Sequence, residues 1–198
     1  MALEIERRFL VSGSAWRSHG RWRRHLRQGY LLESAADLTV RVRGQDPDPL
    51  QQRGAEPSAA WLTLKARPPL AGDGGADPSR PDGLIRLEYE YPIPPADLEA
   101  LLLLCGPRRL EKWRYGLDLP DGDWVVDVYE GANAPLVVAE VELPRADAPL
   151  AIPPWCVREI TGRHNLSNAA LAGRPLACWE PRERQELLEG VAPADAAA

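Results

Sequence analysis

Residues 3–11, LEIERRFLV, alternate in a way that predicts a β-strand with two chemically different faces. Glu4, Glu6 and Arg8 share one face, because a strand points successive side chains to opposite sides. The opposite face carries the apolar side chains Leu3, Ile5 and Phe9. The two glutamates then stand roughly 7 Å apart and repel each other. Such repulsion in a strand calls for a ligand or a partner that offsets it.

Similar alternation along the chain predicts about eight strands and few helices, a β-dominated α+β fold. The further strands are expected at 25–32, 37–44, 60–67, 84–93, 109–119, 123–131 and 135–144. A leucine-rich segment with an early proline and a final glycine predicts a helix over 94–106, and a shorter helical region follows at 164–172. Segments 44–60 and 68–83 are rich in Pro, Gly and Asp and read as loops. Short turns between consecutive strands favour an antiparallel sheet.

Charged residues of like sign recur in pairs on one face of these predicted strands. The acidic pairs are Glu88/Glu90 and Glu140/Glu142, and the basic pairs are Arg41/Arg43, Lys65/Arg67 and Lys112/Arg114. A solvated sheet face would explain one such strand, but it usually mixes charges of both signs. Segregated charges are expected to destabilise the sheet when no ligand is bound. We expect cations to bind the acidic pairs and a polyanion to bind the basic pairs, so that both sets of charges are neutralised.

An eight-stranded twisted sheet can close into a barrel whose polar face lines a channel. Clustered carboxylates without His or Cys suit a hard cation such as Mg²⁺ or Mn²⁺. Clustered Arg and Lys form charge-assisted hydrogen bonds with phosphate oxygens. The residues therefore predict a metal-dependent polyphosphate or triphosphate site inside a closed antiparallel β-barrel.

Composition narrows the class of protein further. The chain has 198 residues, enough for one well-buried domain, and its net charge of −5 argues against general nucleic-acid binding. No apolar run is long enough to span a membrane, and no apolar leader is visible, so a cytoplasmic location is expected. Three scattered cysteines suit reduced thiols. The three histidines share no ligand spacing with each other or with the cysteines, which argues against a zinc site of the usual type.

The sequence resembles the CYTH superfamily, the triphosphate tunnel metalloenzymes, from Glu4 to about Leu171. Glu4, Glu6 and Arg8 occupy the Glu-x-Glu-x-Lys signature, with arginine in place of lysine. Later blocks follow in order: QGYL (28–31), TVRVR (39–43), LTLKAR (62–67), RLEYEY (86–91), KWRYG (112–116), WVVDVYEG (124–131) and VAEVEL (138–143). The resemblance implies an eight-stranded antiparallel tunnel with a few flanking helices. It would occupy residues 1–175 as a single domain, followed by a partly frayed helix and tail at 176–198.

The resemblance also implies roles for individual residues. The metal-binding acids are Glu4, Glu6, Glu140 and Glu142, with Asp127 as a further candidate. The triphosphate cradle consists of Arg8, Arg41, Arg43, Lys65, Arg86, Lys112 and Arg114. The catalytic group comprises Glu88, Glu90, Lys65 and Arg8, with one of the two glutamates orienting the attacking water.

The function that follows is Mg²⁺- or Mn²⁺-dependent hydrolysis of inorganic tripolyphosphate, in which a water activated by the metal releases orthophosphate. The alternatives are a nucleoside triphosphatase, a thiamine triphosphatase, an adenylate cyclase, or a triphosphate-binding regulatory module without turnover. The segment ITGRHNLSN (160–168) departs from the Thr-x-Asp-x-Arg-Tyr-like stretch of the family and bears on the choice of substrate. The expected partner is tripolyphosphate or a small molecule bearing a triphosphate, with no nucleic acid and no membrane, for a monomer or homodimer.

Overall fold

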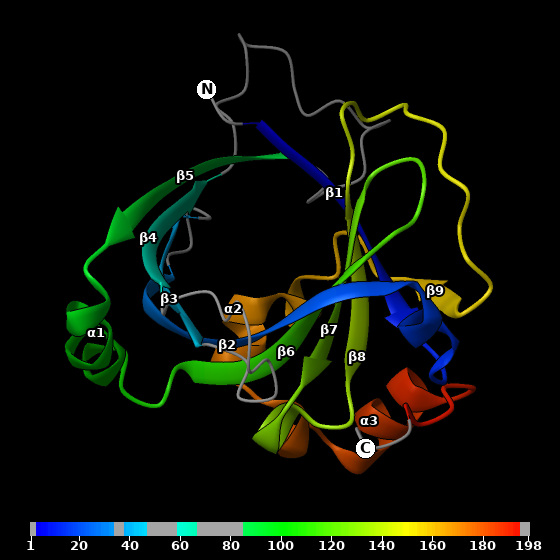
Figure 1. Ribbon diagram of the computed structural model, residues 1–198. Helices are drawn as coiled ribbons and strands as arrows, with labels where there is room; N and C mark the ends of the chain where they lie inside the picture. Colours follow the sequence, from blue (N-terminus) through cyan, green and yellow to red (C-terminus); the bar gives the residue numbers. More distant parts are fainter. Residues whose placement is uncertain (1–2, 34–37, 47–58, 67–84, 195–198) are drawn as a thin grey trace, which may run out of the picture.

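Eight antiparallel strands close into a barrel, and a ninth strand pairs on its outside (Figure 1). The computed structural model describes residues 3–33, 38–46, 59–66 and 85–194. Within these residues the strands are β1 (Leu3–Val11), β2 (Gly20–Glu33), β3 (Thr39–Asp46), β4 (Ala59–Ala66), β5 (Ile85–Ile93), β6 (Arg109–Leu117), β7 (Asp123–Tyr129), β8 (Val137–Glu142) and β9 (Cys156–Glu159). Their order around the sheet is β5-β4-β3-β2-β6-β7-β8-β1-β9.

Strand β1 closes the barrel because its two halves have different neighbours. Residues 3–5 pair with β5, and residues 6–10 pair with β8 on the other side. Beyond the β5 pairing, residues 9–11 pair with β9. The first strand of the chain is therefore joined to segments that follow it by 80 residues or more.

The helical elements are short and lie outside the ring of strands or across one end of it (Figure 1). They are η1 (Ala15–His19), η2 (Pro95–Asp97), α1 (Leu98–Leu104), η3 (Gly131–Asn133), η4 (His164–Leu166), α2 (Asn168–Gly173), η5 (Leu176–Cys178) and α3 (Pro181–Leu188). Reciprocal hydrogen bonds between Glu180 and Glu183 cap α3 at its start. None of the helices in the described residues is long and apolar enough to cross a membrane.

Apolar side chains cover the outer face of the barrel, where the alternation of the strands places them. Phe9, Trp124 and Val126 belong to one buried cluster that also contains Trp16 and Trp155. Helix α1 covers another part of the outer face, where Val42, Ala60, Leu98, Leu102 and Cys105 pack together. This burial supplies most of the favourable free energy of folding, since apolar area removed from water contributes about 25 cal/mol per Å².

A further apolar cluster closes one end of the barrel. Tyr30 and Tyr129 from the strands pack with Leu166 and Leu171 of the segment that contains η4 and α2. Contacts of α2 with β2 and β6 hold this segment against the barrel. The tunnel is thus closed at one end by residues 160–173.

The predicted fold is confirmed, and eight of the strands agree with the expected ones to within a few residues. Strand β2 begins at Gly20 rather than at residue 25, and β9 was not predicted. The four residues of β9, CVRE, are too few to show an alternation that a sequence pattern could reveal. Residues 47–58 of the predicted loop 44–60 and the whole predicted loop 68–83 lie outside the described residues.

Helix α1 packs so closely against β2 that position 29 has no room for a side chain. A Cβ at this position would lie 2.6 Å from Cys105 Sγ and 3.2 Å from Leu102 Cδ2. Gly29→Ala is expected to destabilise the protein by about 1–3 kcal/mol, as overpacking does. Urea unfolding measures the change, with Gly173→Ala as the matched control, since no atom lies within 4 Å of its added Cβ. A Gly29→Ala protein as stable as wild type would contradict the packing described for α1.

Candidate active site

The interior of the barrel carries many charged side chains, and several of them lie directly opposite a side chain of unlike charge on the neighbouring strand. Arg8 lies opposite Glu140, Lys65 opposite Glu88, and Arg114 opposite Asp127 in the strand register. In a β-sheet, directly opposite side chains of unlike charge attract each other. The repulsion expected within each strand is therefore largely offset by the neighbouring strand, and the expectation of an unstable empty sheet is wrong for these positions.

One chain of ion pairs crosses β6, β7, β8 and β1. Asp127 is fully buried, and its two oxygens accept hydrogen bonds from Lys112 Nζ and from Arg114. Arg114 also donates to Glu140 Oε2, and Glu140 Oε1 accepts from Arg8 Nε at 3.1 Å. The pKa of Glu140 lies well below its ordinary value because Arg114, Lys112 and Arg8 outweigh the effect of burial. Both oxygens of Asp127 are engaged by cations, so it anchors Lys112 and Arg114.

A second chain of ion pairs crosses β3, β4, β5 and β1. Lys65 Nζ lies 2.7 Å from Glu4 Oε2 and 2.9 Å from Glu88 Oε2. Arg41 Nη2 lies 3.3 Å from Glu88 Oε1, and it also donates to Thr63 Oγ1 at 3.1 Å. Further along, Arg43 Nη2 donates to both oxygens of Glu90 at 2.9 Å. These contacts bring the predicted catalytic carboxylates and part of the predicted cradle into one network.

Three carboxylates that form no ion pair with Lys or Arg of the described residues lie where β1, β8 and β7 are adjacent. Glu6 lies directly opposite Glu142, and Glu142 lies directly opposite Asp123. Within the described part of the chain, no lysine or arginine is within ion-pair distance of these three groups. Burial raises the pKa of Glu142, and Asp123, Glu88 and Glu6 raise it further. This excess of negative charge is suited to a hard cation held by oxygen ligands.

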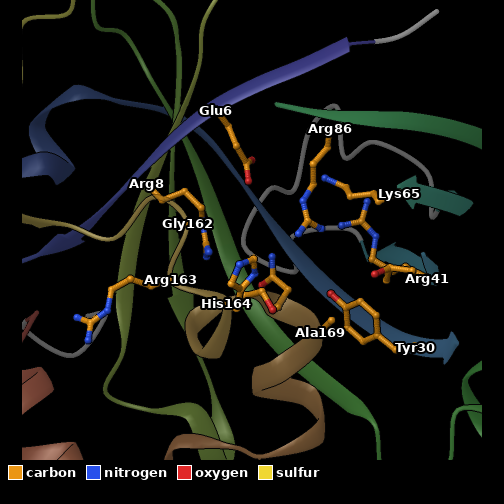
Figure 2. A pocket seen from close by; sticks show the side chains of 13 residues that line it. Glu6, Arg8, Tyr30, Arg41, Lys65, Arg86, Gly162, Arg163, His164 and Ala169 are labelled. Atoms are coloured by element: carbon orange, nitrogen blue, oxygen red, sulfur yellow. The ribbon is translucent and has the colours of Figure 1, made fainter. Parts of the chain in front are cut away.

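A cavity of about 230 Å³ opens beside these networks (Figure 2). A water molecule needs about 10–15 Å³ on the same measure, so the cavity accommodates a small-molecule ligand. The strands contribute Glu6, Arg8, Tyr30, Thr39, Arg41, Lys65 and Arg86 to its wall, and the closing segment contributes residues 162–164 and 167–169. Five predicted site residues thus face one cavity.

Two buried N–H groups of the cavity wall have no hydrogen-bond partner: Arg8 Nη2 and Arg41 Nε. Arg8 is 8% exposed and Arg41 is 7% exposed. A buried donor left without an acceptor costs about 1–3 kcal/mol, more when the group is charged. Because both arginines line the cavity, a ligand rich in acceptor oxygens suits this wall.

Several residues of the site were not predicted from the sequence as site residues. Thr39 shares a parity with Arg41 and Arg43 on β3, which could have revealed it, but it lacks charge. Tyr30 lies on β2, a strand for which the sequence predicted no site residue. His164 and Asn168 come from the closing segment, whose docking against the barrel no strand pattern foretells. Asp123 could have been found from its place opposite Glu142, but only once the register was known.

A separate group of possible metal ligands lies on the outer face of the barrel. His25 Nε2 is 2.9 Å from Glu130 Oε2 and 3.9 Å from Glu111 Oε2. His25 also packs against the ring of Trp113, which points away from the interior because its neighbour Lys112 points inward. The hydrogen bond to Glu130 accounts for the position of this histidine, and the group does not belong to the tunnel.

Comparisons of the sequence and structure with known proteins support the interpretation of the barrel interior as a functional site. The family model described as "CYTH domain" matches residues 2–171. The chain belongs to the CYTH family.

Two curated CYTH relatives are named inorganic triphosphatase. The protein from Acetivibrio thermocellus is 35% identical over 176 residues, covering 88% of this chain and 96% of its own. The protein from Nitrosomonas europaea is 35% identical over 172 residues, covering 85% of this chain and 96% of its own. A crystal structure of an inorganic triphosphatase has a TM-score of 0.56 at 31% identity and covers 87% of this chain and 95% of that one.

The paired carboxyls Glu4 and Glu88 of this CYTH tunnel differ in affinity for a proton. Burial raises the pKa of Glu4 to about 8, and the nearby Glu6 and Glu88 oppose the attraction of Lys65. Burial also disfavours the charged form of Glu88, but Lys65, Arg41 and a hydrogen bond with Glu4 lower its pKa to about 2. Glu88 is therefore ionised at neutral pH, and Glu4 holds a proton more readily than Glu88 does in the metal-free protein.

This difference predicts how the stability of the metal-free protein depends on pH. Glu4 loses its proton near pH 4.5 when unfolded but near pH 8 when folded, so its contribution to stability falls as pH rises between these values. Glu4→Gln, which cannot ionise, is expected to remove this loss. The melting temperature of Glu4→Gln minus that of wild type, measured in EDTA, should therefore increase from pH 5 to pH 9.

The expected increase is several degrees, because 1 kcal/mol shifts the melting temperature by about 2–4 °C at this size. Glu186→Gln, on the exposed face of α3, is the control for loss of a carboxylate elsewhere. A melting-temperature difference for Glu4→Gln that stays constant with pH would contradict the raised pKa of Glu4.

Proposed function

We propose that this protein hydrolyses inorganic tripolyphosphate in a divalent-metal-dependent reaction. The observation that carries the proposal is the pair of buried, unpartnered N–H groups on Arg8 and Arg41, two residues that line the cavity. A polyphosphate supplies the many acceptor oxygens that such donors require. The names of the two curated relatives support the same activity.

The carboxylates at the junction of β1, β8 and β7 fit a hard cation. Glu6 and Glu142 would hold it, with Glu4 nearby. All three are oxygen donors, the ligand type that Mg²⁺ and Mn²⁺ prefer. When bound, such a cation neutralises phosphate charge and lowers the pKa of a water ligand. Asp127 and Glu140, also predicted as metal ligands, form ion pairs with Lys112 and Arg114 in the metal-free protein.

The basic side chains bind and orient the polyphosphate. Arg8, Arg41 and Lys65 line the cavity, and each forms an ion pair with a carboxylate on another strand. Arg86 lies on the same wall, opposite Glu4 in the register. Catalysis of phosphoryl transfer depends mainly on such positioning and on neutralisation of charge.

Glu88 is the group best suited to orient the attacking water. It is ionised at neutral pH and lies against Lys65 and Arg41, which face the bound phosphates. A carboxylate accepts a hydrogen bond from water and so directs the oxygen lone pair toward the terminal phosphorus. The bond between that phosphorus and the bridging oxygen then breaks, and orthophosphate leaves with diphosphate as the second product. A cytoplasmic location and a monomeric or homodimeric state stay predictions of the sequence.

Removal of divalent metal tests the proposed chemistry directly. Phosphate release from tripolyphosphate is expected to stop in excess EDTA and to return with Mg²⁺ or Mn²⁺ but not with Ca²⁺. Ca²⁺ accepts looser coordination than in-line displacement at phosphorus requires. Full activity in EDTA would exclude the metal-dependent reaction. Binding of tripolyphosphate without any turnover under Mg²⁺ or Mn²⁺ would favour a regulatory module instead.

Substitutions of Arg8 test whether arginine at the signature position contributes to activity. Its guanidinium donates to Glu140 and to the Leu166 carbonyl, and it keeps Nη2 for a ligand, which the smaller ammonium of lysine cannot reproduce in the same geometry. Arg8→Ala is expected to lower kcat/KM by roughly 10–100-fold, the equivalent of one lost charged hydrogen bond. Arg8→Lys should cause a smaller loss. Steady-state phosphate release under saturating metal measures both, and an Arg8→Ala protein with wild-type kcat/KM would remove Arg8 from the site.

A further inference from the structure

The segment that closes the tunnel is fixed to β1 through Arg8. The backbone N–H of Ile160 donates to the Arg8 carbonyl at 2.8 Å, and the N–H of Arg8 donates to Thr161 Oγ1 at 3.0 Å. The Arg8 side chain then reaches past this contact and donates from Nη1 to the Leu166 carbonyl at 3.1 Å. Leu166 itself is fully buried. The segment from Ile160 to Leu166, which contains η4, is therefore held to Arg8 at both of its ends.

The residues that follow η4 fix its other side. Ser167 caps α2 by accepting a hydrogen bond from the Ala170 N–H at 3.1 Å. Asn168 Oδ1 accepts from Lys112 Nζ at 3.1 Å and from the Tyr129 hydroxyl at 2.6 Å. Since Lys112 and Tyr129 belong to the buried interior, the backbone of η4 has little freedom to move relative to the cavity.

Between these anchors, His164 extends its side chain into the cavity. Figure 2 shows its ring directed to the same space as the side chains of Arg8 and Arg41, whereas the Arg163 side chain extends away. No side chain of the described residues hydrogen-bonds or pairs with the ring of His164, although η4 is rigidly held. An imidazole N–H is thus presented to the cavity without a partner inside the protein.

We propose that His164 is a specificity-determining residue that contacts a phosphate oxygen of the substrate at the closed end of the tunnel. This inference rests on the proposed function. The ring and the unpartnered Nη2 of Arg8 would bind the same terminal phosphoryl group from two sides. Charged and titratable groups facing this space are Glu6, Arg8, Tyr30, Arg41, Lys65 and Arg86.

The position of His164 also determines which substrates fit. Leu166 and Ala169, which belong to the closing segment beside His164, are buried, so an organic group next to the ring would have to displace them. A phosphoryl group bound there must be unsubstituted. His164 would therefore favour the free end of an inorganic polyphosphate, and a nucleoside or thiamine moiety could be accommodated only at the opposite end.

Three variants test this role through KM and kcat for tripolyphosphate. His164→Ala is expected to raise KM about tenfold or more, the effect of losing one hydrogen bond to a charged group, while kcat changes less. His164→Gln, which keeps an N–H donor, should recover part of that loss. Asn165→Ala is the matched control, because Asn165 is exposed on the same turn but does not line the cavity. It should behave as wild type.

Calorimetric titration with tripolyphosphate in CaCl₂ separates this inference from the proposed function. Wild type should bind about tenfold or more tightly than His164→Ala, even where no turnover occurs. Wild-type protein that binds but never hydrolyses tripolyphosphate would refute the proposed function and leave the His164 contact supported. An unchanged KM and an unchanged affinity in His164→Ala, or an equal loss in Asn165→Ala, would overturn the role of His164. Equal melting temperatures of the variants confirm that the fold is intact.

Discussion

Pairing of unlike charges across neighbouring strands is the constraint on which the interior of this barrel depends. Many charged side chains point toward the axis, so the interior is stable only if charges of opposite sign lie close to one another. Arg8 with Glu140 and Lys65 with Glu88 satisfy this condition at directly opposite positions. Buried ion pairs contribute little net stability, but a lone buried partner costs several kcal/mol. The apolar outer face must therefore stabilise the fold while the interior stays polar.

The same pairing prepares the tunnel for ligands of both signs. In the metal-free protein, the cations that would bind phosphate are already held by carboxylates, so their side chains are ordered before substrate arrives. A polyanion and a divalent cation that enter together can take over these interactions without leaving an isolated charge. Either ligand alone would compete with an existing ion pair, as at Lys65 between Glu4 and Glu88. Binding of metal and substrate is thus expected to be mutually favourable.

Sequence reasoning could find the strands and the inward-facing residues because alternation determines which face a side chain occupies. It could not find their neighbours, since parity does not give the register between strands. Asp127 shows the difference: its parity places it inside, but only the structure shows that Lys112 and Arg114 engage both of its oxygens. The closing segment was harder still. His164 reaches the cavity through tertiary contacts of Arg8 and Leu166 that no local pattern encodes.

The split pairing of β1 has a consequence for the order in which the chain folds. Its partners β5 and β8 lie about 80 and 135 residues further along, as the pairs Ile5–Ile85 and Glu6–Glu142 show. Contacts of such sequence separation form slowly, because a long loop must close before they are made. During synthesis, β1 would leave the ribosome with its glutamates and arginines unpaired and would wait for β8 before the ring could close. Its charged face keeps it soluble during that interval and discourages pairing with other chains, a protection that edge strands commonly need.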